Sequence, residues 1–72
     1  MTFIDQVNTL KRIDGLVRRK ATGTPEQLSD RLDLSRASVY RYIATMKELG
    51  APIDYCKMRR TFYYKQDYIL KI

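Results

Sequence analysis

The chain has 72 residues, which suffices for one small domain with a thin hydrophobic core and excludes a two-domain enzyme. Hydrophobic residues make up 44% of it and charged residues 31%, proportions typical of a folded globular protein. Histidine is absent and there is one cysteine, so imidazole catalysis and zinc sites with two or more Cys or His ligands are excluded. We therefore expect no enzyme, no metal site and no cofactor.

The net charge of +6 is distributed unevenly along the chain. Residues 1–35 contain six basic and five acidic residues, whereas residues 36–72 contain eight basic and three acidic ones. A strongly basic half without a membrane-type amphipathic helix favours a polyanionic partner, of which nucleic acid is the commonest.

The cysteine content and the apolar runs indicate the cellular location. The single Cys56 cannot form an internal disulfide and favours a reducing, intracellular setting, with the thiol as a small filler within a strand. No apolar run reaches the roughly 18 residues of a membrane span. The first ten residues lack the cationic and apolar regions of a signal peptide. We expect a cytoplasmic protein with no membrane partner.

A first helix is predicted over residues 3–20, with Thr2 as its N-cap. The basic residues 18–20 lie where cations stabilise a helix C-terminus, and phosphate contact is the alternative role. The apolar residues that recur on one face, and so predict its core side, are Phe3, Val7, Leu10, Ile13 and Val17, widened by Ile4 and Leu16.

Two further helices are predicted over residues 25–33 and 36–49. Thr24 and Gln27 form a capping box around a proline at the first helical position, which marks the start of the second helix. Ser35 is a suitable N-cap for the third helix, and Gly50 ends it. Two helices joined by so short a turn form a helix-turn-helix unit.

The third helix has two contrasting faces. Val39, Ile43 and Met46 form its core side. The opposite side combines arginines, hydroxyls and small residues, as a helix that enters a DNA groove requires, although a merely solvated face is the alternative. That side carries Ala37, Ser38, Tyr40, Arg41, Ala44, Thr45 and Glu48, with Arg36 at its boundary.

A β-hairpin is predicted over residues 53–65, because two segments of alternating apolar and polar residues flank a turn. A helix-turn-helix followed by a hairpin is a winged helix. Arg59 and Arg60 at the tip, with Lys57 nearby, can contact phosphates or enter a minor groove, whose potential attracts arginine. Solubilising an exposed turn is their alternative role.

The last part of the chain is rich in tyrosine and apolar side chains. Five of the six tyrosines follow residue 41. We expect them to supply core area along the hairpin, with stacking on unpaired bases as the alternative. The apolar tail over residues 66–72 is expected either to add a short strand to the hairpin or to meet a second protomer.

Two stretches, TPEQLSDRLDLSRASVYR from residue 24 and LGAPIDY from residue 49, carry a resemblance to a known family. Together they resemble the N-terminal winged helix-turn-helix domain of bacterial DeoR-like and biotin-repressor-like regulators, including those with a WYL effector domain. The similarity covers roughly residues 4–65. It implies that the start of the third helix contacts DNA, through Ser35, Arg36, Ala37, Ser38, Tyr40 and Arg41, and that Arg59 and Arg60 of the wing contribute.

The chain departs from this family in four respects. Asp33 replaces the usual glycine of the turn, and aspartate tolerates unusual turn dihedrals. Tyr42 replaces a common acidic residue, so that position's role does not carry over. Residues 59–61 replace the wing glycines, which raises the charge of the wing. The effector domain that usually follows has no counterpart in these 72 residues.

The sequence thus predicts an α+β fold, a small winged helix-turn-helix of three helices and a β-hairpin wing in one domain over residues 1–72. It predicts a bacterial or phage protein, associated with the nucleoid, that binds double-stranded DNA without a small-molecule ligand. Its expected role is transcription regulation, with DNA architecture or recombination as the alternative. Either a homodimer through the tail or the first helix, or binding to repeated DNA sites, is expected. A protein-interaction module is the alternative function. The expected DNA-contacting residues are Ser35, Arg36, Ala37, Ser38, Tyr40, Arg41, Thr45, Lys57, Arg59 and Arg60.

Overall fold

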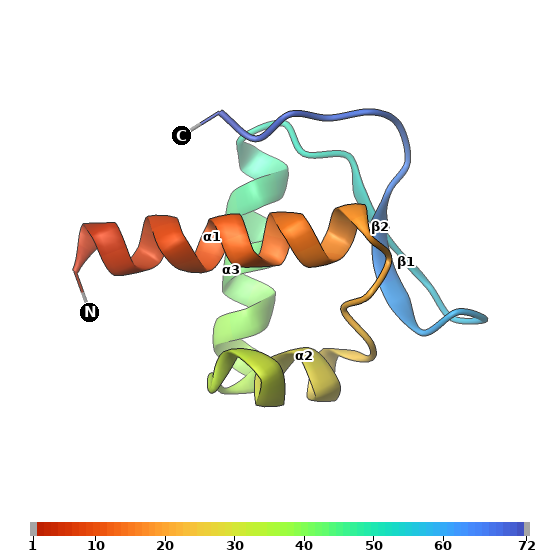
Figure 1. The fold of residues 1–72 in the computed structure, drawn as a ribbon, viewed down its shortest axis with the longest axis horizontal. Coiled ribbons are helices and arrows are strands. Elements are labelled where there is room, and N and C mark those ends of the chain that lie inside the picture. The colour runs from red at the N-terminus through yellow and green to blue at the C-terminus, as the bar shows by residue number, and fades with distance from the viewer. Residues whose placement is uncertain (1, 72) are drawn as a thin grey trace.

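The computed structural model describes residues 2–71 and shows three helices followed by a two-stranded hairpin (Figure 1). This arrangement confirms the predicted α+β winged helix-turn-helix. The elements are α1 (Phe3–Arg18), α2 (Pro25–Leu32), α3 (Arg36–Glu48), β1 (Ile53–Cys56) and β2 (Thr61–Tyr64).

Each helix ends one or two residues earlier than predicted. α1 stops at Arg18 because Arg19 is its C-cap and Lys20 takes a left-handed backbone conformation with φ of 53°. α2 stops before Asp33, which is also left-handed, and Leu49 is the C-cap of α3. These residues are outside the regular helices, so the predicted helix ends at residues 20, 33 and 49 lie one or two residues too far along the chain.

The predicted helix starts are confirmed by their caps. Thr2 accepts a hydrogen bond from the Asp5 amide at 3.1 Å, and its own amide donates to the Asp5 carboxylate at 3.2 Å. Thr24 and Gln27 form the same reciprocal pair at the start of α2. Ser35 accepts from the Ser38 amide at 3.1 Å. Each helix therefore begins where a side chain satisfies an otherwise unpaired amide.

The turn between α2 and α3 depends on Asp33, whose φ of 55° and ψ of 45° lie in the left-handed region. Glycine commonly occupies such positions, and aspartate is among the residues that tolerate them best. The amide of Leu34 then donates to the Ser29 carbonyl at 2.9 Å, which closes the end of α2. The prediction that Asp33 would substitute for glycine here is therefore confirmed.

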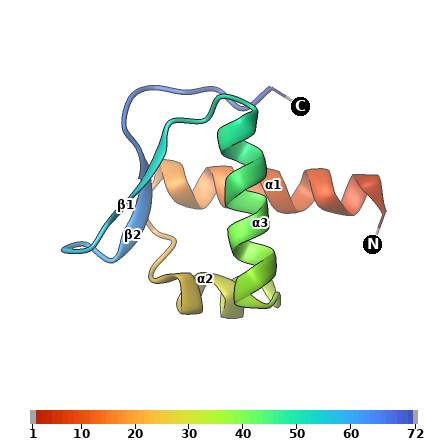
Figure 2. The same ribbon diagram turned by 180° about the vertical axis from the view of Figure 1, so that it is seen from behind.

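α1 lies across α3, and the core forms where the three helices and the hairpin meet (Figures 1 and 2). Phe3 and Ile4 lie outside this core, with 76% and 68% of their surfaces exposed, so their predicted core role is wrong. The first turn of α1 projects beyond α3, and no other described element covers it. The buried apolar residues are Leu10, Ile13, Val17, Leu28, Leu32, Val39, Ile43, Met46, Ala51, Ile53 and Phe62.

The hairpin is anchored to the loop after α1 by two buried threonines. β1 and β2 pair antiparallel, with Cys56 opposite Thr61. The Thr22 hydroxyl accepts from the Phe62 amide at 2.9 Å, and the Thr22 amide donates to the Thr61 hydroxyl at 3.2 Å. Both threonine side chains are buried, so these bonds satisfy polar groups that water does not reach. The wing is thereby fixed against the helices.

Over residues 66–71, the tail after β2 does not form the strand that was one of its two expected roles, and Ile72 lies outside the described residues. Residues 67–71 have no regular structure, and the tail is attached through side chains. In the tail, the Tyr68 carbonyl accepts a hydrogen bond from Arg18. At the end of β2, Tyr64 donates to an Asp14 carboxylate oxygen at 2.6 Å. The Tyr64 and Tyr68 rings lie 5.3 Å apart. Burial and the bond to Asp14 raise the pKa of Tyr64.

Candidate nucleic-acid interface

α3 presents a polar face to solvent, opposite its buried Val39, Ile43 and Met46. Six of the predicted contact residues on and before this helix are exposed, and the seventh, Ser38, is half-buried. The exposed six are Ser35, Arg36, Ala37, Tyr40, Arg41 and Thr45. Because Ala37 and Ala44 are small, the backbone of α3 can approach a surface closely.

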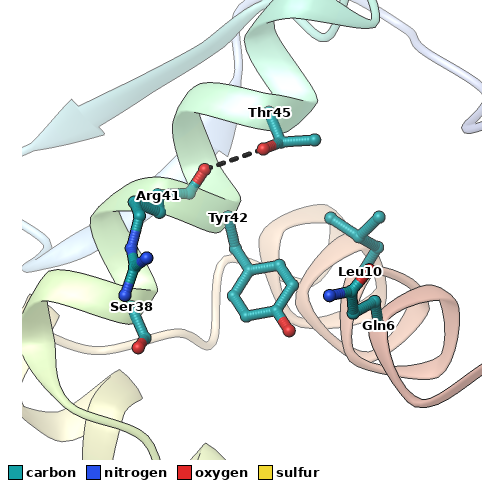
Figure 3. Close-up of a pocket in the computed structure, with 6 residues that line it drawn as sticks. All are labelled: Gln6, Leu10, Ser38, Arg41, Tyr42 and Thr45. Carbon is teal, nitrogen blue, oxygen red and sulfur yellow. Dashed lines mark hydrogen bonds between the residues drawn. The ribbon is translucent and has the colours of Figure 1, made fainter. Parts of the chain in front are cut away.

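Ser38, Arg41 and Thr45 form a stripe along one edge of this face (Figure 3). Their spacing of three and four residues places them on one side of the helix. The Thr45 hydroxyl donates to the Arg41 carbonyl at 3.0 Å, so its oxygen remains available as an acceptor. Arg41 makes no ion pair with any residue in the range 2–71. Its guanidinium is therefore available to bind an external acceptor.

The stripe borders a groove of about 420 Å³ between α3 and the N-terminal half of α1. Gln6 and Leu10 line the other side, and the Tyr42 ring lies between the two helices (Figure 3). Sequence reasoning missed Gln6 as a polar group beside α3. The spacing could have indicated it, because Gln6 lies four residues before the buried Leu10 and therefore on the side of α1 that faces the core.

Arg36 is connected to α2 rather than free. Its guanidinium donates to the Glu26 carboxylate at 3.1 Å, and both side chains are largely exposed, at 62% and 74%. Glu26 lies in the first turn of α2, so this ion pair joins the starts of the two helices. An acidic side chain therefore lies next to Arg36, a predicted DNA contact. The sequence alone does not indicate that these two side chains pair.

The wing carries its cations at the turn between β1 and β2. Lys57, Arg59 and Arg60 are all exposed, and Met58 beside them is 95% exposed. Arg60 adopts φ of 54°, the left-handed conformation that a wing glycine would otherwise supply. The tip projects to the side, away from α3 (Figure 2). The structure therefore presents the wing cations and the α3 stripe as two separate groups.

Lys20 adds a further cation beside the wing. It lines a small hollow of about 160 Å³ together with Arg59, Cys56, Thr61 and Tyr63. Sequence reasoning placed Lys20 at the end of a helix, where its charge would stabilise the helix terminus. Lys20 is instead left-handed and beyond α1, and it borders this hollow together with residues of the hairpin.

Neither a metal cluster nor a membrane-spanning helix occurs in the described part of the chain. Over residues 2–71, no three His, Cys, Asp or Glu side chains are grouped so that they could hold a metal ion. None of the helices in this range is both long and apolar enough to cross a membrane.

A match to a protein-family model agrees with this geometry, whereas no curated protein and no solved structure gave a match. The model of the HTH domain family matches residues 10–57, which run from the middle of α1 into the wing and include all of α2, α3 and β1. This match covers two-thirds of the chain, and the chain therefore belongs to the helix-turn-helix domain family, a DNA-binding rather than an enzymatic family.

Proposed function

We propose that this helix-turn-helix protein binds double-stranded DNA sequence-specifically, with α3 in the major groove. The observation that carries the proposal is the stripe of Ser38, Arg41 and Thr45, in which Arg41 has no ion pair within residues 2–71. Arginine can donate two parallel hydrogen bonds to guanine O6 and N7, and hydroxyls can bond bases or phosphates. A few such contacts supply sequence preference.

The wing supplies affinity through the phosphates. Lys57, Arg59, Arg60 and Lys20 are exposed cations at or beside the hairpin turn. Neutralising phosphates releases counterions and dominates the affinity of many DNA-binding proteins. The wing can therefore bind the flanking backbone or a minor groove while α3 reads base edges. The proposed DNA contacts are Ser35, Arg36, Ala37, Ser38, Tyr40, Arg41, Thr45, Lys57, Arg59 and Arg60. We add Lys20, which lines the hollow beside the wing, and Gln6, which lines the groove beside the α3 stripe.

The biological role that follows is transcriptional control by occupancy of a site at the nucleoid. One helix of this kind reads only a few base pairs, so two copies on adjacent half-sites would lengthen the sequence that is read. The projecting Phe3 and Ile4 of α1, and Ile69 of the tail with 72% exposure, are apolar surfaces on which a second copy can pack. Sedimentation of the wild type and of Phe3→Ser/Ile4→Ser measures this association.

Selection of duplexes from a random pool tests the proposal. Wild-type protein should enrich a short motif, and Arg41→Ala should enrich either no motif or one that lacks a base pair. Binding that falls steeply with salt would accompany this enrichment. If the protein enriches no sequence, or if the variant enriches the same motif equally well, α3 does not read bases.

A further inference from the structure

A second group of cations lies on the outer side of α1, away from the proposed recognition face. Lys11 and Arg12 of α1, its C-cap Arg19, and Arg31 of α2 line a shallow groove of about 400 Å³. The remaining lining residues are Gly15 and the half-buried Leu16. The four cations come from both helices, and their proximity is not evident from the near-neutral charge of residues 1–35.

Within residues 2–71, no acidic side chain forms an ion pair with these four cations. The ion pairs within residues 2–71 join Arg18 to Asp14 and Arg36 to Glu26, and neither uses a cation of the groove. The only hydrogen bond of these four side chains in that range runs from the Arg12 guanidinium to the Arg31 carbonyl at 3.2 Å. Four exposed like charges repel one another, so a bound anion would stabilise this surface.

The groove and the α3 stripe lie on different sides of the molecule. On α1, Lys11, Gly15 and Arg19 fall on the side opposite the buried Ile13 and Val17. α1 lies in front of α3 in Figure 1 and behind it in Figure 2, so its outer side is turned away from α3. A straight duplex held by α3 would therefore leave this surface free.

The lining favours nucleic acid over a protein partner. The centres of protein–protein interfaces are depleted in charged residues, whereas DNA-binding surfaces are strongly positive. Here four of the six lining residues are cationic, and Leu16 is the only large apolar one. A Cβ at Gly15 would meet only the Arg19 guanidinium, at 4.0 Å, so a sugar-phosphate backbone can approach the helix closely there.

We propose that the α1–α2 groove is a second site for duplex DNA, which binds phosphates through Lys11, Arg12, Arg19 and Arg31 without reading sequence. One protomer would then hold a preferred site on α3 and a second DNA segment on α1 and α2. This inference rests on the proposed function, because bridging requires that α3 also binds DNA.

A bead-capture assay tests the bridge. Biotinylated duplex carrying the selected motif is immobilised, protein is added, and retention of a second, fluorescent duplex of random sequence is measured. The test variant is Lys11→Gln/Arg19→Gln/Arg31→Gln, which retains Arg12 because that side chain bonds the end of α2. The control is Lys47→Gln/Lys65→Gln/Lys71→Gln, which removes the same number of charges from exposed positions outside both sites.

The wild type and the control should retain the second duplex, and the test variant should retain at least tenfold less. Affinity of the test variant for the motif duplex alone should stay within about twofold of the control. Circular dichroism checks folding. Lys11→Gln/Arg19→Gln, which alters only an exposed residue of α1 and its exposed C-cap, provides a milder version.

Three results would overturn the inference or separate it from the proposed function. Equal retention by test and control variants would show that bridging comes from a dimer with two α3 helices, or from charge alone, and would overturn it. Motif binding by the wild type without retention of a second duplex would also overturn it. Duplex binding that survives Arg41→Ala but is lost in the test variant would reject the role of α3 and support the groove.

Discussion

The guanidinium of Arg36 donates to the Glu26 carboxylate at 3.1 Å, which places an acidic side chain beside the proposed DNA contact at the start of α3. Glu26→Gln removes this negative charge from the surface that phosphates approach and frees Arg36 to bind them. DNA affinity should rise by about two- to fivefold, measured by fluorescence anisotropy at low salt.

The double-mutant comparison isolates this pair. In an Arg36→Ala background, Glu26→Gln should raise affinity less, because no arginine is released. Thermal stability should fall only slightly in the single variant, since exposed ion pairs contribute about 0.2–1 kcal/mol and Glu26 also favours the start of α2. Unchanged or weaker DNA binding by Glu26→Gln would argue that Arg36 does not contact DNA.

Arg41 should contribute sequence preference rather than general affinity. Arg41→Lys retains the positive charge but loses the planar donor pair that matches guanine. Affinity for the preferred duplex should fall by about 1–3 kcal/mol, while affinity for random duplex should change little. Competition titrations with both duplexes measure the difference. Equal losses on the two duplexes would contradict a base-reading role.

Arg59 at the tip of the wing should act in the opposite way. Arg59→Ala should weaken binding to preferred and random duplexes alike, and should reduce the slope of log affinity against log salt by about one. Lys65→Ala, which removes an exposed cation just after β2, is the matched control and should leave that slope unchanged. A selective loss on the preferred duplex would instead indicate that the wing reads sequence.

The local parts of this fold follow from the sequence, whereas the parts that depend on neighbouring elements do not. Capping residues and the left-handed Asp33 were predictable because their hydrogen bonds join residues a few positions apart. The periodicity of α1 indicates which side is apolar but not how far the partner helices extend, so Phe3 was wrongly placed in the core.

The candidate site shows the same division. The polar face of α3 is a property of one helix, so a helical wheel identifies Arg41 and its neighbours. The Glu26–Arg36 pair and the hollow shared by Lys20 and Arg59 each involve residues of separate elements. Nothing in the spacing of these residues along the sequence indicates that they lie close together. The sequence therefore indicates which side chains α3 exposes, but not which residues of other elements lie next to them.

Thr22 should be important for stability because its bonds fix the hairpin to the helices. Thr22→Val has nearly the same volume but cannot accept from the Phe62 amide, which would be left unpaired in a buried site. The free energy of unfolding in urea should fall by about 1–3 kcal/mol. Thr9→Val removes a hydroxyl that bonds the Asp5 carbonyl on an exposed part of α1, and should cost much less. Equal costs would show that the buried bonds contribute no more than exposed ones.

Tyr64 should make the protein less stable at alkaline pH. Its pKa is raised from an ordinary 10.0 by burial and by its hydrogen bond to Asp14, so the folded state favours the protonated phenol. The associated stability is present in full below about pH 10 and is lost as the pH rises toward the folded-state pKa, because the unfolded chain releases this proton more readily. Unfolding free energies at about pH 9 and about pH 11 should therefore differ more in the wild type than in Tyr64→Phe. Tyr63→Phe, on the same strand and also half-buried, should retain the wild-type difference, and the same pH dependence in both variants would show that Asp14 and Tyr64 are not coupled in this way.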